Sequence, residues 1–129
     1  MNAELHLRKA GPGDYALFIE FLALLKLPPG EPVRGFEGWQ RDLMPKTLFL
    51  EERSRPVGYA VIDPQKPTSY LRQLAVRQEE QRRGLATELM LRLAERAWKG
   101  GARSWCLNVV CRNDAAIALY RKMGMTPRY

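Results

Sequence analysis

The residues best suited to chemistry lie in a short polar loop that follows an apolar, β-prone run and precedes an amphipathic segment. A strand that leads through a tight loop into a helix presents the first helical N–H groups, which lack intrahelical partners and favour an anion. Gly84 allows the backbone to approach a ligand closely, and Ala86 keeps a second position small. Arg82 and Arg83 add positive charge. The loop therefore predicts a site for a phosphate-bearing ligand.

A second segment with candidate polar residues is found at residues 113–125. Asn113 is a favourable residue for the start of a helix, which we expect over residues 114–123. The Tyr120 phenol, with an ordinary pKa of about 10, is protonated at neutral pH and can donate a proton. Taken alone, Tyr120 is better explained as an aromatic side chain packed on the core.

The apolar pattern predicts the elements that position these residues. We expect strands at residues 5–9, 47–51, 57–62, 70–76 and 104–110, and helices at 15–26, within 31–44, from 85 onward and over 114–123. A hairpin at 47–62 beside the strand at 70–76 gives three adjacent antiparallel strands. The helix that connects 70–76 to 104–110 makes those two strands parallel. The expected fold class is α/β (α+β), with a mixed, mostly antiparallel central sheet flanked by helices.

Two of the helices carry more detailed expectations. Asp14 is the predicted N-cap of the helix at 15–26. Because that helix is apolar nearly all round, a second helix or another subunit should cover the face that does not pack on the core. The helix after Gly84 should end at Gly100-Gly101. Its apolar stripe is formed by Leu85, Leu89, Leu93 and Ala97.

Composition limits the functional classes. The 129 residues are expected to form one domain, residues 1–129. The net charge is +7, but the basic residues are scattered, which favours a surface suited to an anionic cofactor over a nucleic-acid-binding face. Cys106 and Cys111 make no zinc pattern with the distant His6, so we expect free thiols and no metal. No apolar run suits a membrane span and no secretion signal is seen, so we expect a cytoplasmic protein.

The two segments together resemble one protein family. The first reads Gln-Arg-Arg-Gly-Leu-Ala at residues 81–86, and the second reads Asn-Asp-Ala-Ala-Ile-Ala-Leu-Tyr-Arg-Lys-Met-Gly at 113–124. They are similar to the acyl-CoA-binding loop, Q/R-x-x-G-x-G/A, and to the following N-x-x-A-x-x-L-Y-x-x-x-G-F segment of the GNAT family of N-acetyltransferases. The resemblance runs from about residue 5 to 129 and is weakest over 28–46. It implies the GNAT fold, with acetyl-CoA as co-substrate and an amine as acetyl acceptor.

The resemblance also implies roles for individual residues. The pyrophosphate of CoA would lie on the backbone N–H groups of Gln81, Arg82, Arg83, Gly84, Leu85 and Ala86. The pantetheine arm would bond to the backbone of the preceding strand at Leu74, Ala75 and Val76. This requires the strands at 70–76 and 104–110 to splay apart. Tyr120 would protonate the departing thiolate, and Asn113 would bond the pantetheine as well as cap its helix.

The sequence departs from the family where a catalytic base is concerned. Many relatives have a glutamate on the strand before the loop, whereas this strand offers Tyr70, Arg72 and Gln73. Glu79 and Glu80 lie in the loop near the expected phosphates and are poor candidates. The base is therefore unassigned. A chain of water molecules, or an acceptor amine that arrives neutral, would suffice.

The second departure concerns the end of the chain, where the family normally continues through a β-hairpin. Only five residues follow Gly124, and Pro127 among them cannot donate to a sheet ladder. We expect either that a second subunit covers this region, as in a homodimer, or that the acceptor pocket is unusually open.

Two functional hypotheses follow. The first is an N-acetyltransferase that transfers the acetyl group of acetyl-CoA to a primary amine of an unidentified small molecule, protein or peptide. The alternative is a non-catalytic acyl-CoA-binding or partner-binding module on the same fold, which the missing base favours and Tyr120 opposes. Trp39 and Phe36 either line the acceptor pocket or pack in the core. The carboxylates that could attract a cationic amine, or simply be solvated, are Glu31, Glu37, Asp42, Glu51 and Glu52.

Overall fold

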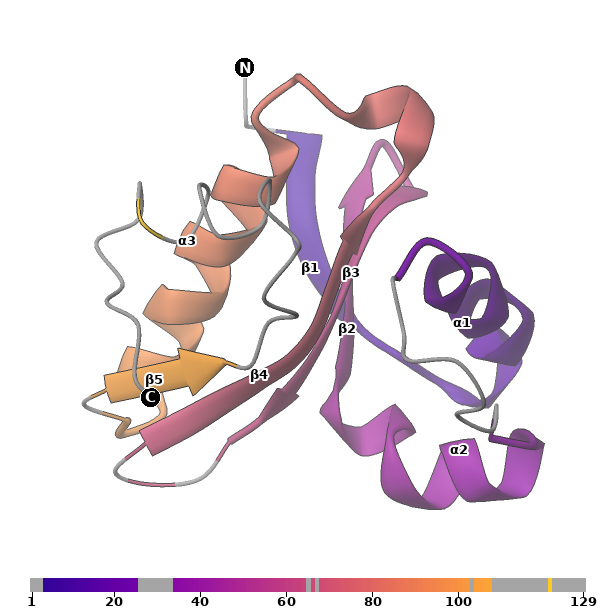
Figure 1. Cartoon of the computed structure of the whole chain (residues 1–129), viewed down its shortest axis with the longest axis horizontal. Coiled ribbons are helices and arrows are strands. Elements are labelled where there is room, and N and C mark those ends of the chain that lie inside the picture. Colours follow the sequence, from indigo (N-terminus) through magenta and orange to yellow (C-terminus); the bar gives the residue numbers. More distant parts are fainter. Residues whose placement is uncertain are drawn as a thin grey trace.

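The computed structural model describes residues 4–25, 34–64, 66, 68–102, 104–107 and 121. Within these residues the chain forms a five-stranded sheet of order β1-β2-β3-β4-β5, with α1 and α2 on one face and α3 on the other (Figure 1). The strands are β1 Leu5–Lys9, β2 Thr47–Glu52, β3 Arg55–Asp63, β4 Thr68–Val76 and β5 Ser104–Leu107. The helices are α1 Tyr15–Leu22, α2 Phe36–Asp42 and α3 Leu85–Lys99.

The sheet has the mixed pairing that the sequence predicted. The neighbouring pairs from β1 to β4 are all antiparallel, and β5 lies parallel to β4. The β2–β3 hairpin closes through Arg53 and Ser54, both of which adopt positive φ values (50° and 66°). Residues 108–110, the predicted helix at 114–123 apart from the helical Arg121, and the tail lie outside the described residues.

Alternating side chains divide the core between the two faces of the sheet. On one face, Leu85, Leu89 and Leu93 of α3 pack against aliphatic residues of the strands, as the predicted stripe requires. Close packing depends on Gly58 of β3, where a Cβ atom would lie 3.2 Å from Leu89 Cδ2 and 3.3 Å from Leu50 Cβ. The glycine therefore lets α3 approach the sheet.

The opposite face carries an aromatic core. Trp39 of α2 is fully buried and stacks on Phe18 of α1 with ring centroids 5.7 Å apart. Phe21 stacks in turn on Tyr59 of β3 at 5.5 Å. A second helix therefore covers α1, as predicted, and Trp39 is a core residue. Phe36 remains 42% exposed at the margin of this cluster.

The prediction for Asp14 was right about its position at the start of α1 but wrong about its hydrogen bonding. Asp14 occupies the N-cap position of α1 but makes no side-chain capping bond to it. Its carboxylate instead accepts hydrogen bonds from the Gly11 N–H at 2.8 Å and from Arg8 Nη1 at 2.8 Å. The charged partner on β1 therefore holds the carboxylate away from the helix. The helix also ends earlier than expected, at Leu22.

The helix α3 agrees closely with prediction. It begins directly after Gly84 and ends where Gly100 N donates to Arg96 O at 3.0 Å. The expected pair between Glu88 and Arg92 is present at 2.8 Å. Within the described residues, no helix is long and apolar enough to cross a membrane.

Candidate cofactor-binding site

The β4–α3 connection is anchored to the sheet at its start. Arg77 N donates to Val57 O at 2.9 Å, and the Arg77 guanidinium donates to Pro56 O at 2.6 Å. A short 3-10 turn, Gln78–Glu80, follows. The predicted loop residue Gln81 turns back, and its Nε2 donates to Val76 O at 3.3 Å. The Gln81 side chain therefore links the loop to the end of β4.

Gly84 sets the geometry at the start of α3. It adopts φ +74° and ψ 14°, a left-handed conformation that favours glycine. Among the described residues no side chain caps the helix there, and apart from the neighbours of Gly84 in the chain none of them has a heavy atom within 4 Å of where a Cβ atom would be. The first bond back to the turn is that of Glu88 N to Gly84 O at 3.0 Å, so the preceding N–H groups of α3 have no intrahelical acceptor. This arrangement suits an anion.

The two loop arginines differ in their surroundings. Arg83 donates to Glu52 Oε2 at 2.7 Å and to Glu80 Oε1 at 3.1 Å. The Arg83 hydrogen bond lowers the pKa of the Glu52 carboxyl, and Glu52 in turn raises the pKa of Arg83. Arg82 is exposed at φ 71° and has no ion-pair partner among the described residues. Arg82 is therefore the loop cation that is free to meet a phosphate.

Strand β4 brings the remaining predicted cofactor residues to the same end of the sheet. Leu74 packs on the α3 face, whereas Ala75 belongs to the aromatic core. Both residues and Val76 pair with β3, opposite Ala60, Tyr59 and Gly58. The recorded β5 pairing covers Thr68–Leu71 of β4. The side chains of Leu74, Ala75 and Val76 are thus explained by packing, and their expected backbone role toward pantetheine stays a prediction.

A bulge interrupts β4 next to this region. Ile62 lies opposite Leu71 and Val61 lies opposite Gln73, so Arg72 is an extra residue in the ladder. Gln73 lies on the same face as Ala75 of the aromatic core because side chains two apart on a strand share a face. The extra residue at Arg72 turns the next apolar residue, Leu71, to the α3 face.

Tyr59 is a polar residue of this region that the sequence reasoning missed. Its side chain is buried, and burial raises the pKa of its phenol. The protonated hydroxyl donates to Gln73 Oε1 at 2.5 Å. The half-buried Gln73 amide is thereby oriented, and its NH₂ group has no acceptor among the described residues. A buried tyrosine needs a hydrogen-bond partner, which was the available signal.

Most of the carboxylates that could attract a cationic amine form ion pairs with basic side chains of the protein. Glu51 is buried and lies 2.9 Å from Arg8 Nε and 3.2 Å from His6 Nε2. Asp42 pairs with two arginines, the nearer contact being 2.7 Å. As expected, β4 carries no carboxylate that could act as a base. Glu79 and Glu80 both pair with Arg55.

Four of the predicted residues lie outside the part of the chain that the structure describes: Tyr120, Asn113, Glu31 and Cys111. Cys106 is a free cysteine, as predicted. The described site therefore consists of the end of β4, the loop and the first turn of α3, with Gln73 and Tyr59 beside it.

Comparisons with solved structures show the fold. An aminoglycoside acetyltransferase from an uncultured soil metagenomic sample, in complex with sisomicin, is 18% identical with a TM-score of 0.75, covering 99% of this chain and 92% of that chain. A ribosomal-protein-alanine N-acetyltransferase from Brucella melitensis biovar Abortus 2308 is 17% identical with a TM-score of 0.76, covering 97% and 94%. An aminoglycoside N-acetyltransferase in complex with CoA is 14% identical with a TM-score of 0.76, covering 97% and 90%.

Comparison at the level of sequence identifies the family. No curated protein matches this chain in sequence. A model of the acetyltransferase (GNAT) family matches residues 16–125, which is most of the chain and includes the β4–α3 loop. Together with the shared fold, this match shows that the chain belongs to the GNAT family of acetyltransferases.

Proposed function

We propose that this GNAT protein is an N-acetyltransferase that transfers the acetyl group of acetyl-CoA to a primary amine. The observation that carries the proposal is the β4–α3 junction. The left-handed Gly84 opens the start of α3, no side chain caps the helix, and the space beside the glycine is clear. Such a helix start suits the pyrophosphate of CoA. The family match and the fold shared with a CoA-bound acetyltransferase support the same ligand.

The chain's own residues would divide the work of binding as follows. Backbone N–H groups from Arg82 to Ala86 hold the phosphates, whereas the Gln81 N–H that was also expected there already donates to Gln78 O at 3.3 Å. Arg82 supplies a free positive charge. The backbone of Leu74, Ala75 and Val76 holds the pantetheine arm as an added strand. The thioester of acetyl-CoA is already activated, so the protein mainly has to position it and stabilise developing charge.

Proton transfer is assigned to the segment that the family resemblance identified. Tyr120 protonates the departing CoA thiolate, because a phenol with a pKa of about 10 is still protonated at neutral pH. Asn113 bonds the pantetheine. No carboxylate of β4 removes the proton from the amine, so the amine arrives neutral or loses its proton to water. The NH₂ group of Gln73 can donate a hydrogen bond to the molecule that accepts the acetyl group.

The acceptor is a primary amine on a small molecule or on a protein or peptide. Solved relatives of the same fold include aminoglycoside and ribosomal-protein-alanine acetyltransferases. The acceptors in their names, an aminoglycoside and the alanine of a ribosomal protein, determine which amines should be tested.

A thiol-release assay tests the proposal. Purified protein is mixed with acetyl-CoA and a panel containing sisomicin, an alanine-terminated peptide, a lysine peptide and a polyamine. We expect CoA release with at least one amine, and strongly reduced release in Tyr120→Phe with CoA binding retained. Tight acetyl-CoA binding without release on any amine would instead support the non-catalytic acyl-CoA-binding module. Unchanged turnover in Tyr120→Phe would reject Tyr120 as the proton donor.

A further inference from the structure

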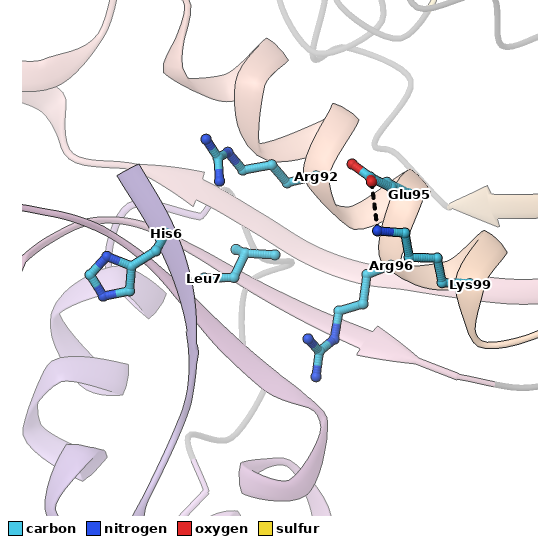
Figure 2. Close-up of a pocket in the computed structure, with 6 residues that line it drawn as sticks. All are labelled: His6, Leu7, Arg92, Glu95, Arg96 and Lys99. Atoms are coloured by element: carbon cyan, nitrogen blue, oxygen red, sulfur yellow. Dashed lines mark ion pairs between the residues drawn. The ribbon is translucent and has the colours of Figure 1, made fainter. Parts of the chain in front are cut away.

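A hollow of about 400 Å³ lies between β1 and α3 (Figure 2). It is lined by His6, Leu7, Arg92, Glu95, Arg96 and Lys99. Leu7 points toward α3, whereas His6 points to the other side of β1. Strand β1 is at one edge of the sheet, and the cofactor loop follows β4, near the other edge. The β1–α3 groove, as we call this hollow, is thus distinct from the candidate cofactor site.

The outer edge of β1 offers unpaired backbone groups. Two hydrogen bonds show which residues of β1 bond to β2. Ala10 N donates to Thr47 O at 3.0 Å, and Arg53 N donates to Glu4 O at 3.4 Å. Even-numbered residues of β1 therefore bond to β2, and alternate residues face the other way. Among the described residues no strand pairs with that outer edge. The outward N–H and C=O groups belong to Leu5, Leu7 and Lys9.

The walls of the groove carry an excess of positive charge. Arg96 is exposed and has no ion-pair partner in the described part of the chain. Lys99 pairs with Glu95 at 2.9 Å, but both side chains are mostly exposed (73% and 64%), so water weakens this pair. Arg92 is held by Glu88. Lys9 adds a further exposed cation on the same face of β1 as Leu7.

We infer that the β1–α3 groove binds an extended acidic peptide segment that adds a strand to the edge of β1. Main-chain bonds to β1 would supply affinity, and carboxylates at every second position would face the cations of α3. A second copy of this chain suits the groove poorly. Pairing β1 with itself would bring Arg8, Lys9 and the cationic walls of two molecules together, and like charges repel.

Fluorescence anisotropy with a labelled peptide of alternating Glu and Thr tests the charge requirement. We expect saturable binding that weakens as salt is added. Arg96→Glu should weaken binding by at least about tenfold, because it reverses the charge of an unpaired cation that lines the groove. The control Arg41→Glu reverses the charge of another exposed arginine, on α2, and should alter binding by less than about twofold. Equal weakening in the two variants would overturn the inference.

A second arm tests strand addition. A peptide of alternating Glu and Pro has the same charge but cannot form the main-chain bonds, so it should bind at least about tenfold more weakly. Lys9→Pro removes an outward N–H of β1 at an exposed position and should weaken the Glu–Thr peptide. Thermal unfolding and CoA binding show whether each variant is folded. Equal binding of the two peptides, or sedimentation showing dimers that Arg96→Glu dissociates, would contradict the proposal.

Discussion

Gly84 is the residue on which the conformation of the β4–α3 loop depends. Its φ of +74° lies in the left-handed region, and a Cβ atom placed there would have no heavy atom of the described, non-neighbouring residues within 4 Å. A substitution therefore tests backbone conformation and not a steric clash. For a residue with a side chain, the left-handed conformation costs about 1–2 kcal/mol.

We predict that Gly84→Ala weakens CoA binding. The unliganded loop can relax out of the strained conformation, and binding must restore it, so the Kd for CoA should rise by roughly 5- to 30-fold. Isothermal titration calorimetry measures the change. Gly13→Ala is the control, because Gly13 has a clear surrounding and no positive φ. CoA binding by Gly84→Ala at wild-type strength would show that the loop does not require the left-handed glycine.

Glu52 competes with an anionic ligand for Arg83. Its carboxylate takes two hydrogen bonds from the guanidinium, at 2.7 Å and 3.0 Å. We predict that Glu52→Gln tightens CoA binding by up to about fivefold, as expected for a partly exposed ion pair. The gain should shrink at high salt. Glu95→Gln, which alters another paired carboxylate, should have no effect. Weaker binding in Glu52→Gln would mean that Glu52 orients Arg83 productively.

At the level of elements, the packing of α3 on the sheet determines the position of the β4–α3 loop. We predict that Gly58→Val lowers the free energy of unfolding by about 1–3 kcal/mol, because the added atoms meet Leu89 and Leu50 in a packed core. Chemical denaturation measures this effect. The control Gly38→Ala lies in α2 with a clear surrounding and should be neutral or stabilising. A Gly58→Val variant of wild-type stability would show that α3 does not pack closely there.

The elements were largely predictable because their apolar periods are regular. The α3 stripe and the Gly84 and Gly100 boundaries needed only local pattern. Asp14 was misjudged because its charged partner, Arg8, lies on a different element. The Tyr59–Gln73 bond was missed because it joins two strands whose register is shifted by the bulge at Arg72. Contacts that depend on register or on charge across elements cannot be read from local pattern.

At the scale of the whole molecule, a cluster of charges joins β1, β2 and the start of α1. Arg8 pairs with Asp14 at 2.8 Å and with Glu51 at 2.9 Å. The Arg8 hydrogen bonds hold the pKa of Asp14 below its ordinary value. A carboxyl with a depressed folded-state pKa stabilises the fold above its unfolded pKa of about 3.9. That contribution is lost as the pH falls from there through the folded-state pKa.

We predict that Asp14→Asn destabilises the protein by about 1 kcal/mol at neutral pH, a modest value because Arg8 is partly exposed. The difference from wild type should shrink as the pH falls below about 4. Urea unfolding at several pH values measures it. Asp42→Asn, which removes an exposed paired carboxylate, should change stability little. A difference that is the same at low and neutral pH would rule out the charge of Asp14 as its cause.

Acetyl-CoA is proposed to bind at the β4–α3 junction, and amide hydrogen exchange measured by mass spectrometry tests this directly. With saturating acetyl-CoA, we predict slower exchange in peptides covering residues 72–88, where the backbone N–H groups would become bonded to the ligand. Gly84→Ala should reduce that protection at the same ligand concentration. Binding of acetyl-CoA without protection of residues 72–88, or with protection confined to β1 and the second half of α3, would contradict the central claim.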